Sequence, residues 1–281
     1  MRVIRFCLTI LIASIMTTIV FAQQKNEVSV TPKIKEGYVN VDGGQVWYQI
    51  VGTGNAIPLL VLHGGPGYPH DYLEPIADLG NERPVIFYDQ LGCGKSERPL
   101  DSALYTIERF VKELAEIREA LHLDRVHILG HSWGSMLATD YLLTKPEGVI
   151  SVILASPCLN SQQWVKDQKK YLTAFPDSIQ QLIKISEQQG TTDSDEYQAA
   201  IELFYSRHVC RKDPWPEYMV RAMAGVGADV YTYMWGPSEF YCTGNLKDYD
   251  RTDRLGEITV PVLFTCGQYD GARPETVKRF H

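Results

Sequence analysis

One short stretch constrains this chain more than any other. An apolar run at 126–129 leads into Gly-His-Ser-Trp-Gly at 130–134, and a helix-forming segment follows at 136–143. A strand, Gly-x-Ser-x-Gly and a helix in this order are typical of a nucleophile elbow, a tight turn that presents a serine hydroxyl. The small flanking glycines fit, because the two backbones approach each other closely there. The motif alone arises by chance roughly one time in ten, but its flanking elements make Ser132 the candidate nucleophile.

Strand and helix patterns alternate along much of the chain. Largely apolar runs, as expected of strands buried on both faces of a sheet, occur at 59–62, 85–88, 126–129, 149–154 and 262–265. The clearest helical pattern is at 107–121. This alternation predicts an α/β fold, with a mainly parallel sheet covered by helices on both faces. Runs at 38–41 and 46–51, joined by a turn at 42–44, predict an antiparallel hairpin at one edge.

The alternation stops between residues 158 and 254. That segment is largely helical in pattern and rich in aromatic residues, and it has no buried-strand run. We interpret it as a helical cap inserted into the α/β core. Most of its aromatic side chains are expected to form the cap's own core, and a few to line a cleft between cap and sheet.

The first residues have the pattern of an export signal. Arg2 and Arg5 precede a largely apolar run at 6–21, and Ala22 is a small residue at the expected cleavage site. The alternative is an uncleaved anchor, but the run is shorter than the ~20 residues of a spanning helix. The predicted organisation is a signal peptide at 1–22, the first part of the core at 23–157, the cap at 158–254 and the second part of the core at 255–281. We expect export to the periplasm or the medium, with no stable membrane insertion after cleavage.

Charge and cysteine content exclude several classes of function. The chain has a formal net charge of −7 and no basic run, which argues against nucleic acid as a partner, because such binding depends on neutralising phosphates. Without Cys7 in the signal, five cysteines remain, an odd number with no tight spacing; they are Cys93, Cys158, Cys210, Cys242 and Cys266. This pattern predicts neither a disulfide framework nor a zinc site. We expect mostly free, buried thiols, no metal and no cofactor.

A glycine-rich loop follows the first buried strand, with His-Gly-Gly-Pro-Gly at 63–67. A serine hydrolase stabilises the negative charge on the substrate's carbonyl oxygen with backbone N–H groups fixed in advance. In α/β-hydrolases one N–H belongs to the residue after the nucleophile, here Trp133, and the other to a glycine-rich loop after the third strand. Gly65 fits the second position; the alternative is an ordinary tight turn.

The acid and the base are expected in that order after the serine. Asp270 follows the strand at 262–265, at the edge where sites in parallel sheets assemble; the alternative is a simple turn aspartate. Six of the seven histidines precede Asp270, and His281 follows it by only 281 − 270 = 11 residues. A helix, a strand and two loops need about 20 to 30 residues. We therefore expect the triad histidine, the last strand and the final helix to be missing from this sequence.

Several longer segments together resemble one family. They are HGGPG at 63–67, FYDQLGCGKSERP at 87–99, GHSWGS at 130–135, WGPSEF at 235–240, GNLKDYDRTD at 244–253 and VPVLFTCGQYD at 260–270. In these segments the chain resembles the prolyl aminopeptidases (proline iminopeptidases) of the α/β-hydrolase fold, and especially their tricorn-interacting branch. The match spans nearly all of the chain after the signal, including the cap.

The resemblance implies a serine exopeptidase that removes the N-terminal residue, preferably proline, from short peptides. It implies that Ser132 attacks the carbonyl, Asp270 orients the base, and Gly65 and Trp133 bind the oxyanion. Glu239 matches a cap carboxylate that binds the free amine of the peptide; on residue type alone it would be a surface glutamate. The branch carries a second glutamate after the triad aspartate, where this chain has Gly271. That difference keeps an esterase open as an alternative, and a non-catalytic α/β-hydrolase-like protein is a third.

Overall fold

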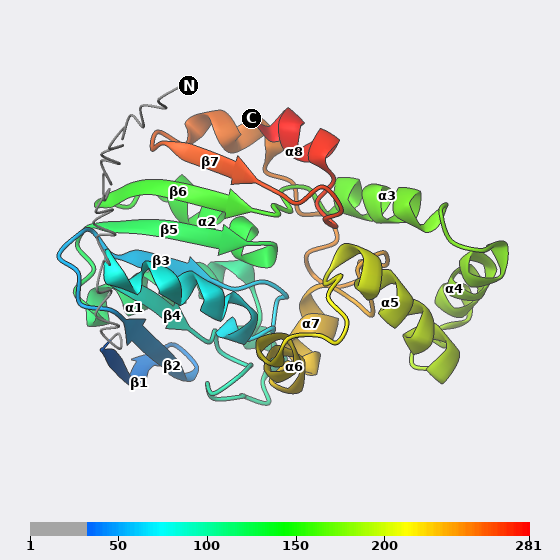
Figure 1. The fold of residues 1–281 in the computed structure, drawn as a ribbon, viewed down its shortest axis with the longest axis horizontal. Coiled ribbons are helices and arrows are strands. Elements are labelled where there is room, and N and C mark those ends of the chain that lie inside the picture. Colours follow the sequence, from blue (N-terminus) through cyan, green and yellow to red (C-terminus); the bar gives the residue numbers. More distant parts are fainter. Residues whose placement is uncertain (1–32) are drawn as a thin grey trace, which may run out of the picture. The chain divides into compact units, whose positions relative to one another are not determined.

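The computed structural model describes residues 33–281 (Figure 1). The predicted signal peptide at 1–22 lies outside these residues. Among the helices that are described, none is both long and apolar enough to span a membrane.

A seven-stranded sheet forms the centre of the described chain, in the order β1-β2-β4-β3-β5-β6-β7. The strands are β1 (Ile34–Val41), β2 (Gly44–Val51), β3 (Leu59–Leu62), β4 (Val85–Tyr88), β5 (Val126–His131), β6 (Val149–Ala155) and β7 (Val262–Thr265). β1 and β2 pair antiparallel as a hairpin, and β2 pairs antiparallel with β4. The other pairings of the sheet are parallel. The prediction of a mainly parallel sheet with an antiparallel edge is confirmed.

Outside the segment between β6 and β7, helices and 3₁₀ turns alternate with the strands of the parallel part of the sheet, as expected. The helices are α1 (Ile107–Ala120), α2 (Trp133–Leu143), α3 (Ser161–Leu172), α4 (Asp177–Gln189), α5 (Asp195–His208), α6 (Glu217–Ala224), α7 (Ala228–Met234) and α8 (Pro274–Phe280), with 3₁₀ turns η1 (His70–Asn81), η2 (Ser102–Leu104) and η3 (Thr252–Glu257). Thr106, Asn160 and Ser194 begin α1, α3 and α5, and each side-chain oxygen accepts a hydrogen bond from the backbone N–H three residues on. Such caps satisfy N–H groups that have no partner inside the helix.

Alternating side chains of the central strands pack into two different cores. Leu60 and Leu62 are fully buried in the larger cluster, with side chains of α1 and α2. Leu59 and Val61 point to the other face and pack in a separate cluster with Leu73 of η1. Successive side chains of a strand point to opposite faces, so an uninterrupted apolar run needs cover on both, and the helices supply it.

Between β6 and β7 the described chain forms no strand and instead builds five α-helices, α3 to α7. Part of this segment has a core of its own, in which Phe175, Phe204 and Phe240 are buried. In Figure 1 α3, α4 and α5 extend beyond the end of the sheet at which β5, β6 and β7 terminate. The cap therefore stands over the carboxyl edge of the parallel strands.

The elbow holds β3, β5 and α2 together at two glycines. A Cβ on Gly130 would lie 2.2 Å from the carbonyl oxygen of Gly134, and one on Gly134 would lie 2.2 Å from that of Leu62. Both contacts are with backbone atoms, which cannot swing aside as a flexible side chain can. Any larger residue at either position must push the strand and the helix apart.

We expect Gly134→Ala to lower the free energy of unfolding by about 1 to 3 kcal/mol, the usual cost of overpacking. Gly256→Ala is the matched control, because a Cβ there would meet no atom within 4 Å. Urea denaturation of both variants measures the difference. Equal midpoints for the two variants would contradict the close approach.

Candidate active site

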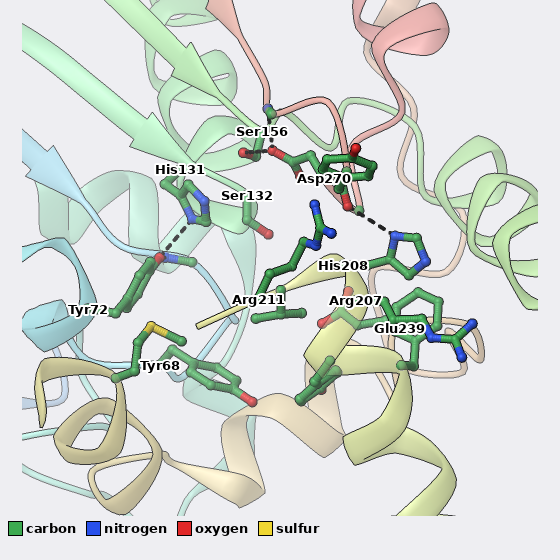
Figure 2. A pocket seen from close by; sticks show the side chains of 18 of the residues that line it. Tyr68, Tyr72, His131, Ser132, Ser156, Arg207, His208, Arg211, Glu239 and Asp270 are labelled. Atoms are coloured by element: carbon green, nitrogen blue, oxygen red, sulfur yellow. Dashed lines mark hydrogen bonds between the residues drawn. The ribbon is translucent and has the colours of Figure 1, made fainter. Parts of the chain in front are cut away.

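Ser132 is held in a backbone conformation that few side-chain-bearing residues adopt. It lies between β5 and α2 with φ 52° and ψ −119°, a strained region whose occurrence clusters at functional sites. Figure 2 shows Ser132 at a cavity of about 350 Å³ that Asp270 and Glu239 also line. The sequence-predicted nucleophile, acid and amine-binding carboxylate are thus brought to one cavity.

Two backbone N–H groups lie beside Ser132 and donate no hydrogen bond within the described chain. Gly65, at φ 114°, has no room for a Cβ, which would lie 2.6 Å from the backbone nitrogen of Gly67. Trp133 is the first residue of α2. A backbone N–H at this position has no acceptor inside the helix and lies at the positive end of the helix dipole. Gly65, Ser132 and Trp133 line a small recess next to the cavity. This arrangement can stabilise an oxyanion.

Gln90, which the sequence reasoning missed, joins the two sides of this recess. Its Oε1 accepts a hydrogen bond from the indole Nε1 of Trp133 at 2.8 Å, and its Nε2 donates to the carbonyl oxygen of His63 at 3.2 Å. Its backbone N–H donates to Nε2 of His63 at 2.8 Å. Burial lowers the pKa of His63 to about 4, so the ring is neutral and can accept that bond. The available signal was a pair of polar residues, Asp89 and Gln90, after the buried strand β4.

Asp270 is fixed by three donors in the loop that follows β7. Its Oδ2 accepts from the hydroxyl of Ser156 at 2.5 Å and from the N–H of Gly267 at 3.0 Å, and its Oδ1 accepts from the N–H of Ala272 at 2.8 Å. Ser156 directly follows β6 and was not predicted as part of the site. These bonds hold the carboxylate in one orientation at the cavity.

The side chain of His131 is directed toward Tyr72 (Figure 2). Its Nδ1 accepts a hydrogen bond from the hydroxyl of Tyr72 at 2.8 Å, because that oxygen already accepts the N–H of Gly64 at 2.6 Å. Burial lowers the pKa of His131, and a neutral ring suits this bond.

Of the other histidines only His208 lines the cavity, and each described contact of these rings is with a group other than Ser132 or Asp270. Nδ1 of His208 donates to the carbonyl of Tyr269, and the remaining contacts are His63 with Gln90, His70 with Asp89 and His127 with Ser151. His122 precedes β5, at the edge of the sheet away from the cavity, and His281 follows α8. Among residues 33–281, no histidine ring is hydrogen-bonded to the hydroxyl of Ser132 or the carboxylate of Asp270.

Glu239 is a carboxylate turned toward the cavity. Its Oε2 accepts from Nε1 of Trp164 at 3.1 Å, and its Oε1 accepts from the hydroxyl of Tyr231 at 2.9 Å. Burial raises its pKa, and these two hydrogen bonds only partly counteract that effect. No cation of the described chain pairs with it. Gly271 also lines the cavity but contributes only backbone.

The five described cysteines are free, but only Cys93 and Cys158 are buried. The expectation of mostly buried thiols is therefore wrong for the other three. One group of possible metal ligands in the described chain, His70, Asp71 and Glu74, lies away from the cavity. Arg221 forms ion pairs with both carboxylates of that group, and Asp89 binds its histidine.

Comparison with known proteins agrees with this geometry. Residues 57–280 match the family model described as the alpha/beta hydrolase fold. The chain is 51% identical over 247 residues to a proline iminopeptidase of Heyndrickxia coagulans, covering 87% of this chain and 86% of that protein. A proline iminopeptidase of Saccharolobus solfataricus is 37% identical over 252 residues, with 88% and 81% covered.

Solved structures give the same result. Proline iminopeptidase of Mycobacterium smegmatis superposes with a TM-score of 0.79 at 34% identity, covering 88% of this chain and 86% of that chain. The structure of VinJ gives a TM-score of 0.83 at 33% identity, with the same coverage of 88% and 86%.

Proposed function

Because the chain belongs to the proline iminopeptidase family of the α/β-hydrolase fold, we propose that it removes the N-terminal residue, preferably proline, from short peptides through an acyl-enzyme on Ser132. It is a serine hydrolase. The observation that carries the proposal is that one cavity is lined by a strained serine, by Gly65 of the oxyanion recess and by the carboxylate of Glu239.

The geometry supports a two-step reaction. The hydroxyl of Ser132 attacks the carbonyl carbon of the first residue and gives its proton to a base. The N–H groups of Gly65 and Trp133 stabilise the resulting oxyanion. The peptide bond then breaks, and the leaving amine takes up the proton. Water hydrolyses the serine ester and releases the free amino acid. Glu239 holds the ammonium group of the substrate, so only a residue with a free amine is positioned for attack.

The base is the part of the triad for which the described residues offer no candidate. Asp270 is oriented at the cavity, yet its described hydrogen-bond donors are a serine hydroxyl and two backbone N–H groups. A triad acid acts through a histidine that it orients. We infer that none of the seven histidines in this sequence acts as the base.

We therefore expect the 281-residue chain to hydrolyse a prolyl-nitroanilide very slowly, because removing a triad histidine costs on the order of 10⁶-fold in kcat. Added imidazole should raise the rate by acting as a diffusible base, and Ser132→Ala should abolish the imidazole-dependent part. Nitroaniline release measures both. Fast hydrolysis without imidazole that Ser132→Ala abolishes would overturn the inference about the base.

An esterase is the second candidate, and Gly271 favours it, because a second amine-binding carboxylate is absent at that position. An esterase would cleave a simple acetyl ester with imidazole and leave the prolyl-nitroanilide intact. A non-catalytic protein would cleave neither substrate under any of these conditions.

The raised pKa of Glu239 predicts how amine binding depends on pH. Its carboxyl group is neutral below that pKa and cannot pair with an ammonium ion, so the affinity for prolinamide should rise as the pH increases. Calorimetric titration at several pH values up to about pH 7, below the usual pKa of about 7.7 to 8.0 of an α-amino group, measures the trend while the ligand stays charged. Glu239→Gln should bind weakly at every pH. A pH-independent affinity in the parent protein would contradict this role.

We also propose that the protein is exported, with cleavage after Ala22. In cells that express the whole chain, the protein should be recovered from the periplasm or the medium and should begin at Gln23. Fractionation followed by N-terminal sequencing measures this. Recovery in the cytosol with Met1 intact would contradict the proposal.

A further inference from the structure

We propose that Arg207 and Arg211 form a subsite that binds the free C-terminal carboxylate of a short peptide. This inference rests on the proposed function, because it places the substrate's amine at Glu239. It adds the substrate class: dipeptides and tripeptides whose two charged ends are both recognised.

Both arginines belong to the cavity that contains Ser132. Arg207 lies in the last turn of α5, Arg211 lies three residues beyond its end, and both line the cavity (Figure 2). Two hydrogen bonds connect the end of α5 to the loop that contains Asp270. Nδ1 of His208 donates to the carbonyl oxygen of Tyr269 at 3.0 Å, and the backbone carbonyl oxygen of His208 accepts from the N–H of Gly271 at 3.1 Å. The arginines are therefore positioned relative to the reacting groups.

Aromatic rings hold the two guanidinium groups in place. The Cζ atom of Arg207 lies 4.2 Å from the ring centroid of Phe175, and that of Arg211 lies 3.7 Å from that of Tyr269. Such stacking is a weak electrostatic attraction at exposed sites. It leaves the N–H groups at the edge of the guanidinium free to bind a carboxylate. A side chain that is already ordered loses less entropy when a ligand binds.

Neither arginine has a carboxylate within 4.0 Å among residues 33–281. Five other arginines of the same region form ion pairs: Arg109, Arg221, Arg251, Arg254 and Arg273. Arg83, Arg98, Arg118, Arg125 and Arg279 likewise form no ion pair within residues 33–281, so what sets Arg207 and Arg211 apart is that both line one cavity. The negative end of the dipole of α5 accounts for a cation in its last turn, but Arg211 lies beyond the helix.

The charges at the cavity match a zwitterionic peptide. Glu239 is shielded by Trp164 and Tyr231, while both arginines are exposed. Burial lowers the pKa of His208, so the positive charge near neutral pH comes from the arginines. A cavity of about 350 Å³ is also small for a ligand site. When the N-terminal amine of a short peptide binds Glu239, the C-terminal carboxylate of the same peptide therefore lies near the arginines.

The test compares two ligands that differ only at the C-terminus. Prolyl-glycine and prolyl-glycinamide are titrated calorimetrically into the Ser132→Ala variant, which cannot form an acyl-enzyme. We expect the acid to bind about tenfold more tightly than the amide, as a charge-assisted contact of about 1.4 kcal/mol gives. In Arg207→Gln/Arg211→Gln this ratio should fall to about one. Arg254→Gln, which removes an arginine remote from the cavity, should keep it.

Each outcome has a distinct meaning. Equal binding of acid and amide in the Ser132→Ala variant, or a ratio that survives the double substitution, overturns the subsite and leaves the proposed function standing. Binding of neither ligand overturns both. A tenfold ratio that is lost only in the double variant, and that shrinks as salt screens the charges, supports the subsite.

Discussion

The close approach of β3, β5 and α2 is the constraint on which the site depends. Gly130 and Gly134 allow backbones to meet where any Cβ would collide with a carbonyl oxygen. The chain must then turn sharply at Ser132, and it does so through a left-handed conformation. That turn exposes the serine at the cavity and leaves the N–H of Trp133 at the free end of a helix. The positions of the candidate nucleophile and of one candidate oxyanion donor are therefore consequences of one packing contact.

The rest of the site is assembled by buried polar links between loops. Gln90 connects the loop after β3 to the first residue of α2, and Ser156 connects the end of β6 to Asp270. The two bonds of Gln90 form away from water, where an unpaired polar group would cost about 1 to 3 kcal/mol, and the bond of Ser156 is partly buried. The loops are thereby held before any substrate arrives, as electrostatic stabilisation of an oxyanion requires. The cap adds Glu239 and the two cavity arginines, which we propose recognise the two charged ends of the substrate.

Elements with strong local patterns could be predicted from the sequence. The runs at 59–62, 85–88 and 262–265 match their strands residue for residue, because they change abruptly to polar or turn residues. The edge strand β1 begins at Ile34, four residues before its expected start, because its first residues are exposed and lack an apolar pattern. Ser132 and Gly65 lie in recognisable motifs. Gln90 and Ser156 do not, since their partners are 43 and 114 residues away in the chain.

The central claim is that one cavity binds an N-terminal residue with its carbonyl oxygen between Gly65 and Trp133. A crystal structure of the Ser132→Ala variant with bound prolyl-glycine tests it most directly. The account predicts the carbonyl oxygen within hydrogen-bond distance of both backbone nitrogens and the proline nitrogen at the carboxylate of Glu239. A dipeptide bound with its carbonyl oxygen away from these two N–H groups, or with its amine away from Glu239, would contradict it.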